Sequence, residues 1–192
     1  MLVREEIEWR ANTYNLLAGL LSAPPTDKVL STLSQIGGKS PDPANKPLSA
    51  AWIAVAKSAH SATSKAIHDE YQTLFIGITR GEIIPYASWY VSGFLMEKPL
   101  ANIRRDLNIM GIKRCKNTHE PEDHVAALFE VMTLLIQDNN EAHIAFFKNH
   151  IEPWINRLFH DIAYAQSADF YRSIAQLGIA FMTLEKNLLE LH

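Results

Sequence analysis

Hydrophobic residues recur every three or four positions along nearly the whole chain, which is the period of an amphipathic helix. The pattern predicts about nine helices, at 7–21, 26–36, 48–59, 64–75, 100–110, 121–136, 140–150, 153–165 and 168–191. No segment alternates apolar and polar residues as a half-buried strand does, and no internal repeat stands out. The sequence therefore predicts an all-α helical bundle.

Proline and threonine mark the boundary between the first two predicted helices. Pro24 and Pro25 end the first helix, because proline lacks an amide donor and restricts the residue before it. Thr26 can then cap the second helix through its side-chain oxygen. The last predicted helix is the most regular, and we interpret it as a core helix of the bundle rather than a dimeric coiled coil. Its apolar positions are Phe170, Ile174, Leu177, Phe181, Leu184, Leu188 and Leu191.

Three segments interrupt the helical pattern. Residues 37–47 are rich in glycine, proline and small polar residues, which predicts an irregular exposed loop. Residues 76–90 lose the helical period at two glycines and a proline, yet they stay apolar and aromatic. Residues 111–120 form a polar break with several basic side chains.

Composition narrows the classes of function. A chain of 192 residues with 47% hydrophobic residues can bury a real core, and its net charge of −3 gives no basic face for nucleic acid. The charged N-terminal residues lack the apolar region of a signal peptide, and no apolar run is long enough to span a membrane. The lone Cys115 rules out an intramolecular disulfide. We therefore expect a cytoplasmic protein without stable membrane insertion.

Enzyme and metal motifs are missing from the sequence. It has no phosphate-binding loop, no dinucleotide fingerprint and no Gly-x-Ser-x-Gly nucleophile elbow, so we expect a protein that is not an enzyme. His119 and His124 are separated by Pro121 and cannot share a helical face as a zinc site requires, so we expect no metal and no cofactor. We interpret 120–123 as a helix start, with Glu120 as cap and Pro121 as first helical residue.

The aromatic segment after residue 76 has two interpretations. Tyr86, Trp89 and Tyr90 could plug the end of the bundle, or they could line a pocket for a peptide, because rings with polar tips dominate recognition sites. The residues alone leave both open.

Three short motifs, in this order, carry a family resemblance. They are Tyr71-x-x-Leu74-Phe75-Ile76-Gly77, Pro85-Tyr86-x-Ser88-x-Tyr90 and Glu120-Pro121-x-Asp123-His124. With them the chain resembles the TorD-like family of cytoplasmic chaperones for exported molybdoenzymes, which also contains DmsD. The resemblance implies two helical parts, 1–110 and 121–192, joined by a hinge at 111–120.

The resemblance also implies a function. The protein would bind the twin-arginine signal peptide, or leader, of a molybdopterin-containing oxidoreductase subunit, and its mature part as a further contact, until the cofactor is inserted. Asp123 and His124 carry over as leader-binding residues of the hinge groove, and the aromatic motifs as its apolar wall. We expect acidic residues of 120–123 to accept hydrogen bonds from the leader's arginines. The predicted peptide-binding residues are Leu74, Phe75, Pro85, Tyr86, Ser88, Trp89, Tyr90, Glu120, Pro121, Glu122, Asp123 and His124.

Several alternatives stay open beside this interpretation. Some relatives bind GTP weakly or form domain-swapped dimers, so the resemblance allows a monomer or a swapped homodimer, and weak GTP binding. A small hydrolase or nucleotide-binding enzyme at the hinge, a metal- or haem-binding bundle and a helical adaptor are rival functions. Residues 78–82 are more polar than in DmsD-like proteins, which leaves the client open.

Overall fold

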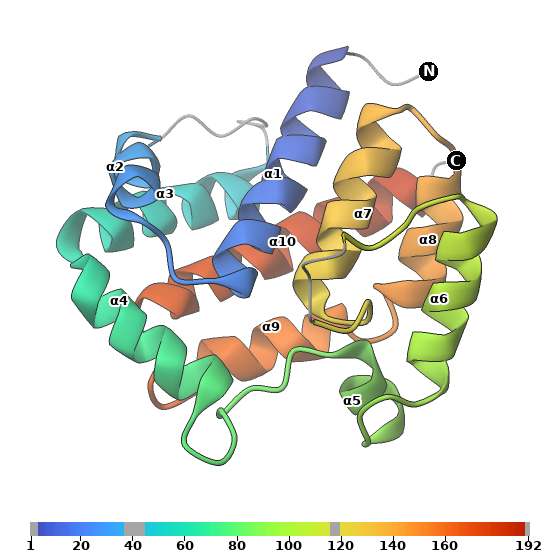
Figure 1. Cartoon of the computed structure of the whole chain (residues 1–192). Coiled ribbons are helices and arrows are strands. Elements are labelled where there is room, and N and C mark those ends of the chain that lie inside the picture. Colours follow the sequence, from blue (N-terminus) through green and yellow to red (C-terminus); the bar gives the residue numbers. More distant parts are fainter. Residues whose placement is uncertain (1–3, 37–44, 116–119, 191–192) are drawn as a thin grey trace. The chain divides into compact units, whose positions relative to one another are not determined.

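The computed structural model describes residues 4–36, 45–115 and 120–190 (Figure 1). These residues form ten α-helices and one short π-helix, and their one strand-like pairing is an isolated bridge between Tyr86 and His124. The predicted all-α fold is confirmed, with one α-helix more than the nine expected. The helices are α1 (Arg4–Ser22), α2 (Asp27–Gln35), α3 (Lys46–Ser61), α4 (Ser64–Tyr71), the π-helix η1 (Gln72–Ile76), α5 (Ala87–Ser92), α6 (Lys98–Ile109), α7 (Val125–Gln137), α8 (Ala142–His150), α9 (Ile155–Tyr164) and α10 (Phe170–Glu190).

Contacts divide the chain into two compact units, and each unit is built from two separate stretches of sequence. The first unit comprises Met1–Ser22 and Pro85–Ile155, and the second comprises Ala23–Ile84 and Asn156–His192. This grouping differs from the predicted parts 1–110 and 121–192. Residues 116–119 of the predicted hinge lie outside the described residues, so the hinge stays a prediction.

The core of the first unit lies between α1 and α7, which pack along each other (Figure 1). The ring of Tyr14 meets the ring of Phe129 edge to face at 5.3 Å between centroids, and both side chains are fully buried. Thr133 donates from its hydroxyl to the carbonyl oxygen of Ala11 at 3.4 Å, which links the two helices. The smaller helix α5 packs on α6, and α8 packs on α7.

The second unit is centred on α10, which packs against α3 (Figure 1). The predicted apolar stripe of α10 is buried at Phe170, Ile174, Leu177 and Phe181 and half-buried at Leu184 and Leu188, whereas Leu191 lies outside the described residues. Gly178 lets α10 approach α9 closely, because a Cβ at this position would lie 2.3 Å from the ring of Phe159. Trp52 and Val55 of α3 are also buried.

The N-terminus of α10 is capped by a carboxylate from α4. Glu70 accepts hydrogen bonds from the backbone amides of Asp169 at 2.8 Å, Phe170 at 3.0 Å and Tyr171 at 2.8 Å. These amides have no partner within the helix, and a negative charge is stabilised at this end of the helix dipole. A single side chain thus satisfies the first turn of α10 and ties it to α4.

Helix boundaries agree with the sequence at some positions and not at others. Thr26 caps α2 as predicted, accepting from the amide of Val29 at 3.4 Å. The prediction for 120–123 is wrong: these residues form a non-helical turn, and α7 begins at Val125 after His124 as N-cap. Glu120 and Pro121 therefore do not start a helix, because the backbone after them pairs with a different segment. The prediction of irregular structure up to residue 90 is also wrong in part, since α5 begins at Ala87.

No helix within 4–36, 45–115 and 120–190 is long and apolar enough to cross a membrane. Within the same residues, no three His, Cys, Asp or Glu side chains come together as a metal site would require. His119, which entered the sequence test for zinc, lies outside the described part of the chain.

Candidate functional site

The second and third sequence motifs lie side by side in the first unit. The amide of Ala87 donates to the carbonyl oxygen of Asp123 at 2.9 Å, and the amide of Val125 donates to the carbonyl oxygen of Pro85 at 2.9 Å. Between these two bonds lies the antiparallel bridge of Tyr86 and His124. Two segments that are far apart in sequence are therefore joined in a fixed register.

Asp123 caps α5 from the neighbouring segment. The N-cap residue of α5, Tyr86, makes no side-chain capping bond, and the carboxylate of Asp123 accepts from the amide of Ser88 at 3.1 Å. The side chain of Asp123 is only 1% exposed. A charge-assisted bond to the first turn of a helix is stronger than a neutral one, so Asp123 fixes where α5 begins.

His124 caps the next helix, α7. Its Nδ1 accepts from the amide of Ala126 at 3.2 Å, and its ring meets the ring of Tyr86 edge to face at 5.0 Å. Burial lowers the pKa of His124 below its ordinary value of 6.5, although the charges of Glu120 and Asp123 act in the opposite direction. A neutral imidazole is the form that can accept from the amide, so pKa and geometry agree. His124 therefore has a structural role as the N-cap of α7.

The two glutamates of the turn are held by donors of the same unit. Tyr86 donates from its hydroxyl to the carboxylate of Glu120. One carboxylate oxygen of Glu122 accepts a hydrogen bond from the Nε of Arg104 at 2.8 Å. The other oxygen lies 3.8 Å from the Nε of Arg114. Partial burial alone would raise the pKa of Glu122, but its own amide and the two arginines lower it below the ordinary value. Glu122 is therefore negatively charged at neutral pH.

The aromatic residues of the second motif differ in how far they are buried. Tyr90 stacks on the buried Trp154 with 5.4 Å between ring centroids, and Tyr86 and Trp89 are half-buried. Pro85 and Ser88 are buried, and the hydroxyl of Ser88 is one of two buried side-chain atoms without a hydrogen-bond partner in the described residues. The rings of Tyr86, Trp89 and Tyr90 and the residues 120–122 are thus the parts of the predicted site that reach the surface of this unit.

The first sequence motif belongs to the second unit. Leu74 is fully buried, and the half-buried ring of Phe75 contacts the rings of Tyr71 at 5.0 Å and Tyr171 at 5.2 Å. Gly77 has φ of 64°, and a Cβ there would lie 2.1 Å from a backbone carbonyl oxygen, so only glycine fits the turn that ends η1. Leu74 and Phe75 therefore build the core and a turn of one unit, and the other ten predicted residues lie in the other unit.

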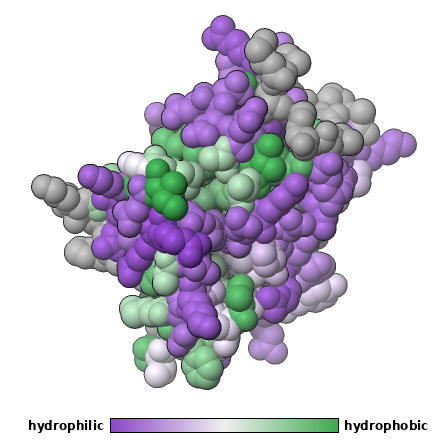
Figure 2. Space-filling view, turned by 90° about the vertical axis from the view of Figure 1, so that its right-hand side faces the viewer, coloured by the Kyte–Doolittle hydropathy of each residue, from purple (hydrophilic) through white to green (hydrophobic). Residues whose placement is uncertain are grey.

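An exposed apolar segment begins in the last turn of α5 and continues beyond it, and the sequence analysis did not select it. Val91, Phe94, Leu95 and Met96, here named the Val91–Met96 run, are between 49% and 74% exposed. Figure 2 shows a mostly hydrophilic face of the molecule on which hydrophobic patches are interspersed. A short apolar stretch outside any helical stripe was the only signal in the sequence.

A pocket of about 400 Å³ lies beside the Val91–Met96 run in the first unit. Its apolar wall comes from Ala87, Val91, Pro99, Ile103 and Trp154. On its polar side, the Nε2 of His150 lies 2.8 Å from the carboxylate of Asp106. The pocket thus joins α5, α6 and the end of α8 and is apolar on one side only.

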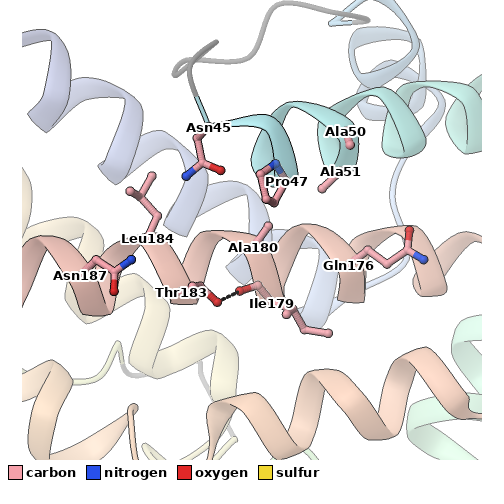
Figure 3. Close-up of a pocket in the computed structure, with 10 residues that line it drawn as sticks. All are labelled: Asn45, Pro47, Ala50, Ala51, Gln176, Ile179, Ala180, Thr183, Leu184 and Asn187. Carbon is pink, nitrogen blue, oxygen red and sulfur yellow. Dashed lines mark hydrogen bonds between the residues drawn. The ribbon is translucent and has the colours of Figure 1, made fainter.

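The second unit has a pocket of its own, of about 560 Å³, between α3 and α10 (Figure 3). Small side chains such as Ala50, Ala51 and Ala180 keep this groove open, and Asn45 and Asn187 lie at one end of it. None of its lining residues is charged. The groove offers apolar and amide contacts but no carboxylate to pair with a cation.

Comparison with known proteins places this fold and these motifs in a family. The family model of the nitrate reductase delta subunit matches residues 40–160, which is more than half of the chain. The "Chaperone protein TorD" of Vibrio cholerae is 28% identical over 134 residues, covering 63% of this chain and 61% of that protein. The "Probable Tat proofreading chaperone DmsD" of Haemophilus influenzae is 26% identical over 128 residues, covering 66% and 62%. The chain thus spans about three fifths of the length of these relatives.

A solved structure supports the fold as well. The crystal structure of a candidate redox enzyme maturation protein from Archaeoglobus fulgidus superposes with a TM-score of 0.62 over 91% of this chain and 93% of that chain. Its sequence identity is 15%, so the likeness concerns the fold alone. The names of the sequence relatives are those of chaperones, in agreement with the prediction that the chain is not an enzyme. The predicted resemblance is confirmed, and the chain belongs to the nitrate reductase delta subunit family.

Proposed function

We propose that this protein is a cytoplasmic chaperone for the maturation of a redox enzyme. It binds the twin-arginine leader of an exported molybdopterin-containing subunit and holds that subunit until its cofactor is inserted. The observation that carries the proposal is the fixed pairing of the acidic turn 120–124 with the aromatic segment 85–90 in the first unit. Negative charge and aromatic surface are thereby brought together in one part of the first unit.

The acidic turn suits the two arginines of a leader. A guanidinium group prefers a carboxylate that can accept two parallel hydrogen bonds. Glu120 is exposed and Glu122 is partly exposed, so both can be reached from solvent. Asp123 is buried on the amide of Ser88, and we assign it a positioning role instead of direct contact with the leader.

In the absence of a leader, Glu122 forms ion pairs with two arginines of the chain itself. Arg104 and Arg114 are both about half exposed, and exposed ion pairs contribute only about 0–1 kcal/mol each. A leader arginine can therefore take the place of Arg104 or Arg114 at small cost. Without a leader, the ion pairs with Arg104 and Arg114 keep Glu122 ionised and oriented.

The rings supply the apolar part of the binding free energy. Burying three or four apolar side chains of the leader contributes roughly 1.5–3 kcal/mol each, and ordering the leader costs about 2–5 kcal/mol. The surplus corresponds to a dissociation constant of about micromolar or lower. Tyr86, Trp89 and Tyr90 are the rings of the segment that are partly open to a partner.

The proposal is tested by titrating the protein with a synthetic leader that carries two consecutive arginines and an apolar stretch. The double variant Glu120→Gln/Glu122→Gln removes both charges with almost no change in shape, and we expect it to weaken binding at least about tenfold. Glu141→Gln, an exposed glutamate outside the turn in the same unit, is the matched control and should bind as the wild type does. Equal affinity of all three proteins would refute the assignment of the turn.

A further inference from the structure

The Val91–Met96 run brings four exposed apolar side chains together within six residues of the first unit. Phe94 is 69% exposed and Met96 is 74% exposed, and Leu95 lies between them. Single exposed apolar residues are ordinary, whereas several in succession mark an interaction surface. Their backbone turns away from the helix, since α5 ends on the left-handed Gly93 and Met96 has φ of 59°.

The run lies at one end of α5, and the acidic turn lies at the other. The turn is bonded to the first residues of the helix, through the amides of Ala87 and Ser88. Val91 is in the last turn of the same helix. A helix of six residues is about 9 Å long, so negative charge and apolar surface follow each other within a short distance.

A pocket continues the apolar surface away from the run. Val91 is exposed and also lines the pocket of about 400 Å³, together with Ile103 of α6 and Trp154. A volume of this size can hold one or two large apolar side chains. The charged groups on its far side are paired with each other, since Asp106 has Arg105 at 3.1 Å and His150 at 2.8 Å.

The order of charge and apolar surface along α5 matches the order of a leader, in which an arginine pair precedes an apolar stretch of roughly 7–15 residues. We propose that the Val91–Met96 run and the pocket beside it bind the apolar stretch of the leader whose arginines lie at Glu120 and Glu122. This inference rests on the proposed function and adds a second contact area to it. A leader bound in this direction places its apolar residues over the exposed side chains of the run without leaving the first unit.

The experiment compares two peptides on two variants. One peptide is the full synthetic leader, and the other ends directly after the arginine pair. The double variant Phe94→Ser/Met96→Ser removes apolar surface from the run. The matched control Ile109→Ser/Leu134→Ser removes two apolar side chains that are 78% and 49% exposed on α6 and α7 of the same unit. Far-ultraviolet circular dichroism and thermal melting show that each variant is folded.

We expect Phe94→Ser/Met96→Ser to weaken the full leader roughly tenfold or more and to leave the short peptide unchanged. The control variant should bind both peptides as the wild type does. If the run variant binds the full leader with wild-type affinity while Glu120→Gln/Glu122→Gln still weakens it, the inference is wrong and the proposed function stands. If the wild type binds neither peptide, the proposed function fails together with the inference.

Discussion

Replacing Asp123 by alanine removes the carboxylate that caps α5. The amide of Ser88 is then left buried without its acceptor, at 0% exposure of the residue. Loss of a helix cap costs about 0.5–2 kcal/mol, and an unsatisfied buried donor costs about 1–3 kcal/mol. Because both figures describe the same hydrogen bond, we expect a loss of about 2 kcal/mol in the free energy of unfolding rather than their sum.

The melting temperature and the leader affinity should both respond. A loss of about 2 kcal/mol lowers the melting temperature of a chain of this size by about 4–8 °C. Affinity for the leader should fall too, because the rings of Tyr86 and Trp89 stand at the start of α5 and lose their fixed position. Thermal melting followed by circular dichroism and leader titration by calorimetry measure the two effects on the same preparation.

Asparagine at the same position separates positioning from direct contact. Asp123→Asn keeps an oxygen that can accept from the amide of Ser88, but it removes the charge. We expect it to retain most of the leader affinity and to lower the melting temperature less than Asp123→Ala does. If Asp123→Asn loses binding as completely as the alanine variant while its melting temperature is unchanged, Asp123 contacts the leader directly and our reasoning is refuted.

Three further changes have defined outcomes. Because burial lowers the pKa of His124, the unfolded chain binds a proton there more readily, so the free energy of unfolding should fall as the pH drops through about 6.5. His124→Asn keeps a capping oxygen, and urea unfolding at pH 5–8 should show that this pH dependence of the free energy of unfolding is lost. Arg104→Ala frees one side of Glu122 and should raise the association rate and affinity of the leader by a few-fold in stopped-flow and calorimetric titrations, and a weaker complex would contradict the exchange of arginines. Glu70→Ala leaves three amides at the start of α10 without their carboxylate and should cost about 1–3 kcal/mol in urea unfolding, whereas Glu70→Gln should cost less.

Local periodicity was enough to predict most helices, because each one buries a stripe of its own residues. The stripe of α10 and the inward side chains of α3 follow directly from spacing. Thr26 was predicted as a cap because it acts on the helix that it precedes. These features depend on residues within a few positions of each other.

Features that join distant segments could not be predicted in the same way. The acids and the proline of 120–123 have the composition of a helix start. However, the carboxylate of Asp123 accepts a hydrogen bond from the amide of Ser88 in α5, and its carbonyl oxygen accepts one from the amide of Ala87. Glu70 likewise caps a helix about 100 residues further along the chain. A carboxylate that caps a remote helix leaves no mark in the local pattern, and neither does the combination of separate stretches into one unit.

Hydrogen exchange measured with and without saturating leader tests most directly where the leader binds. We predict slower exchange of backbone amides in 85–96 and 120–125, and less slowing in 120–125 at the same peptide concentration when the arginine pair of the peptide is replaced by glutamine. Slower exchange confined to α3 and α10, where the second unit has its uncharged groove, would contradict the account.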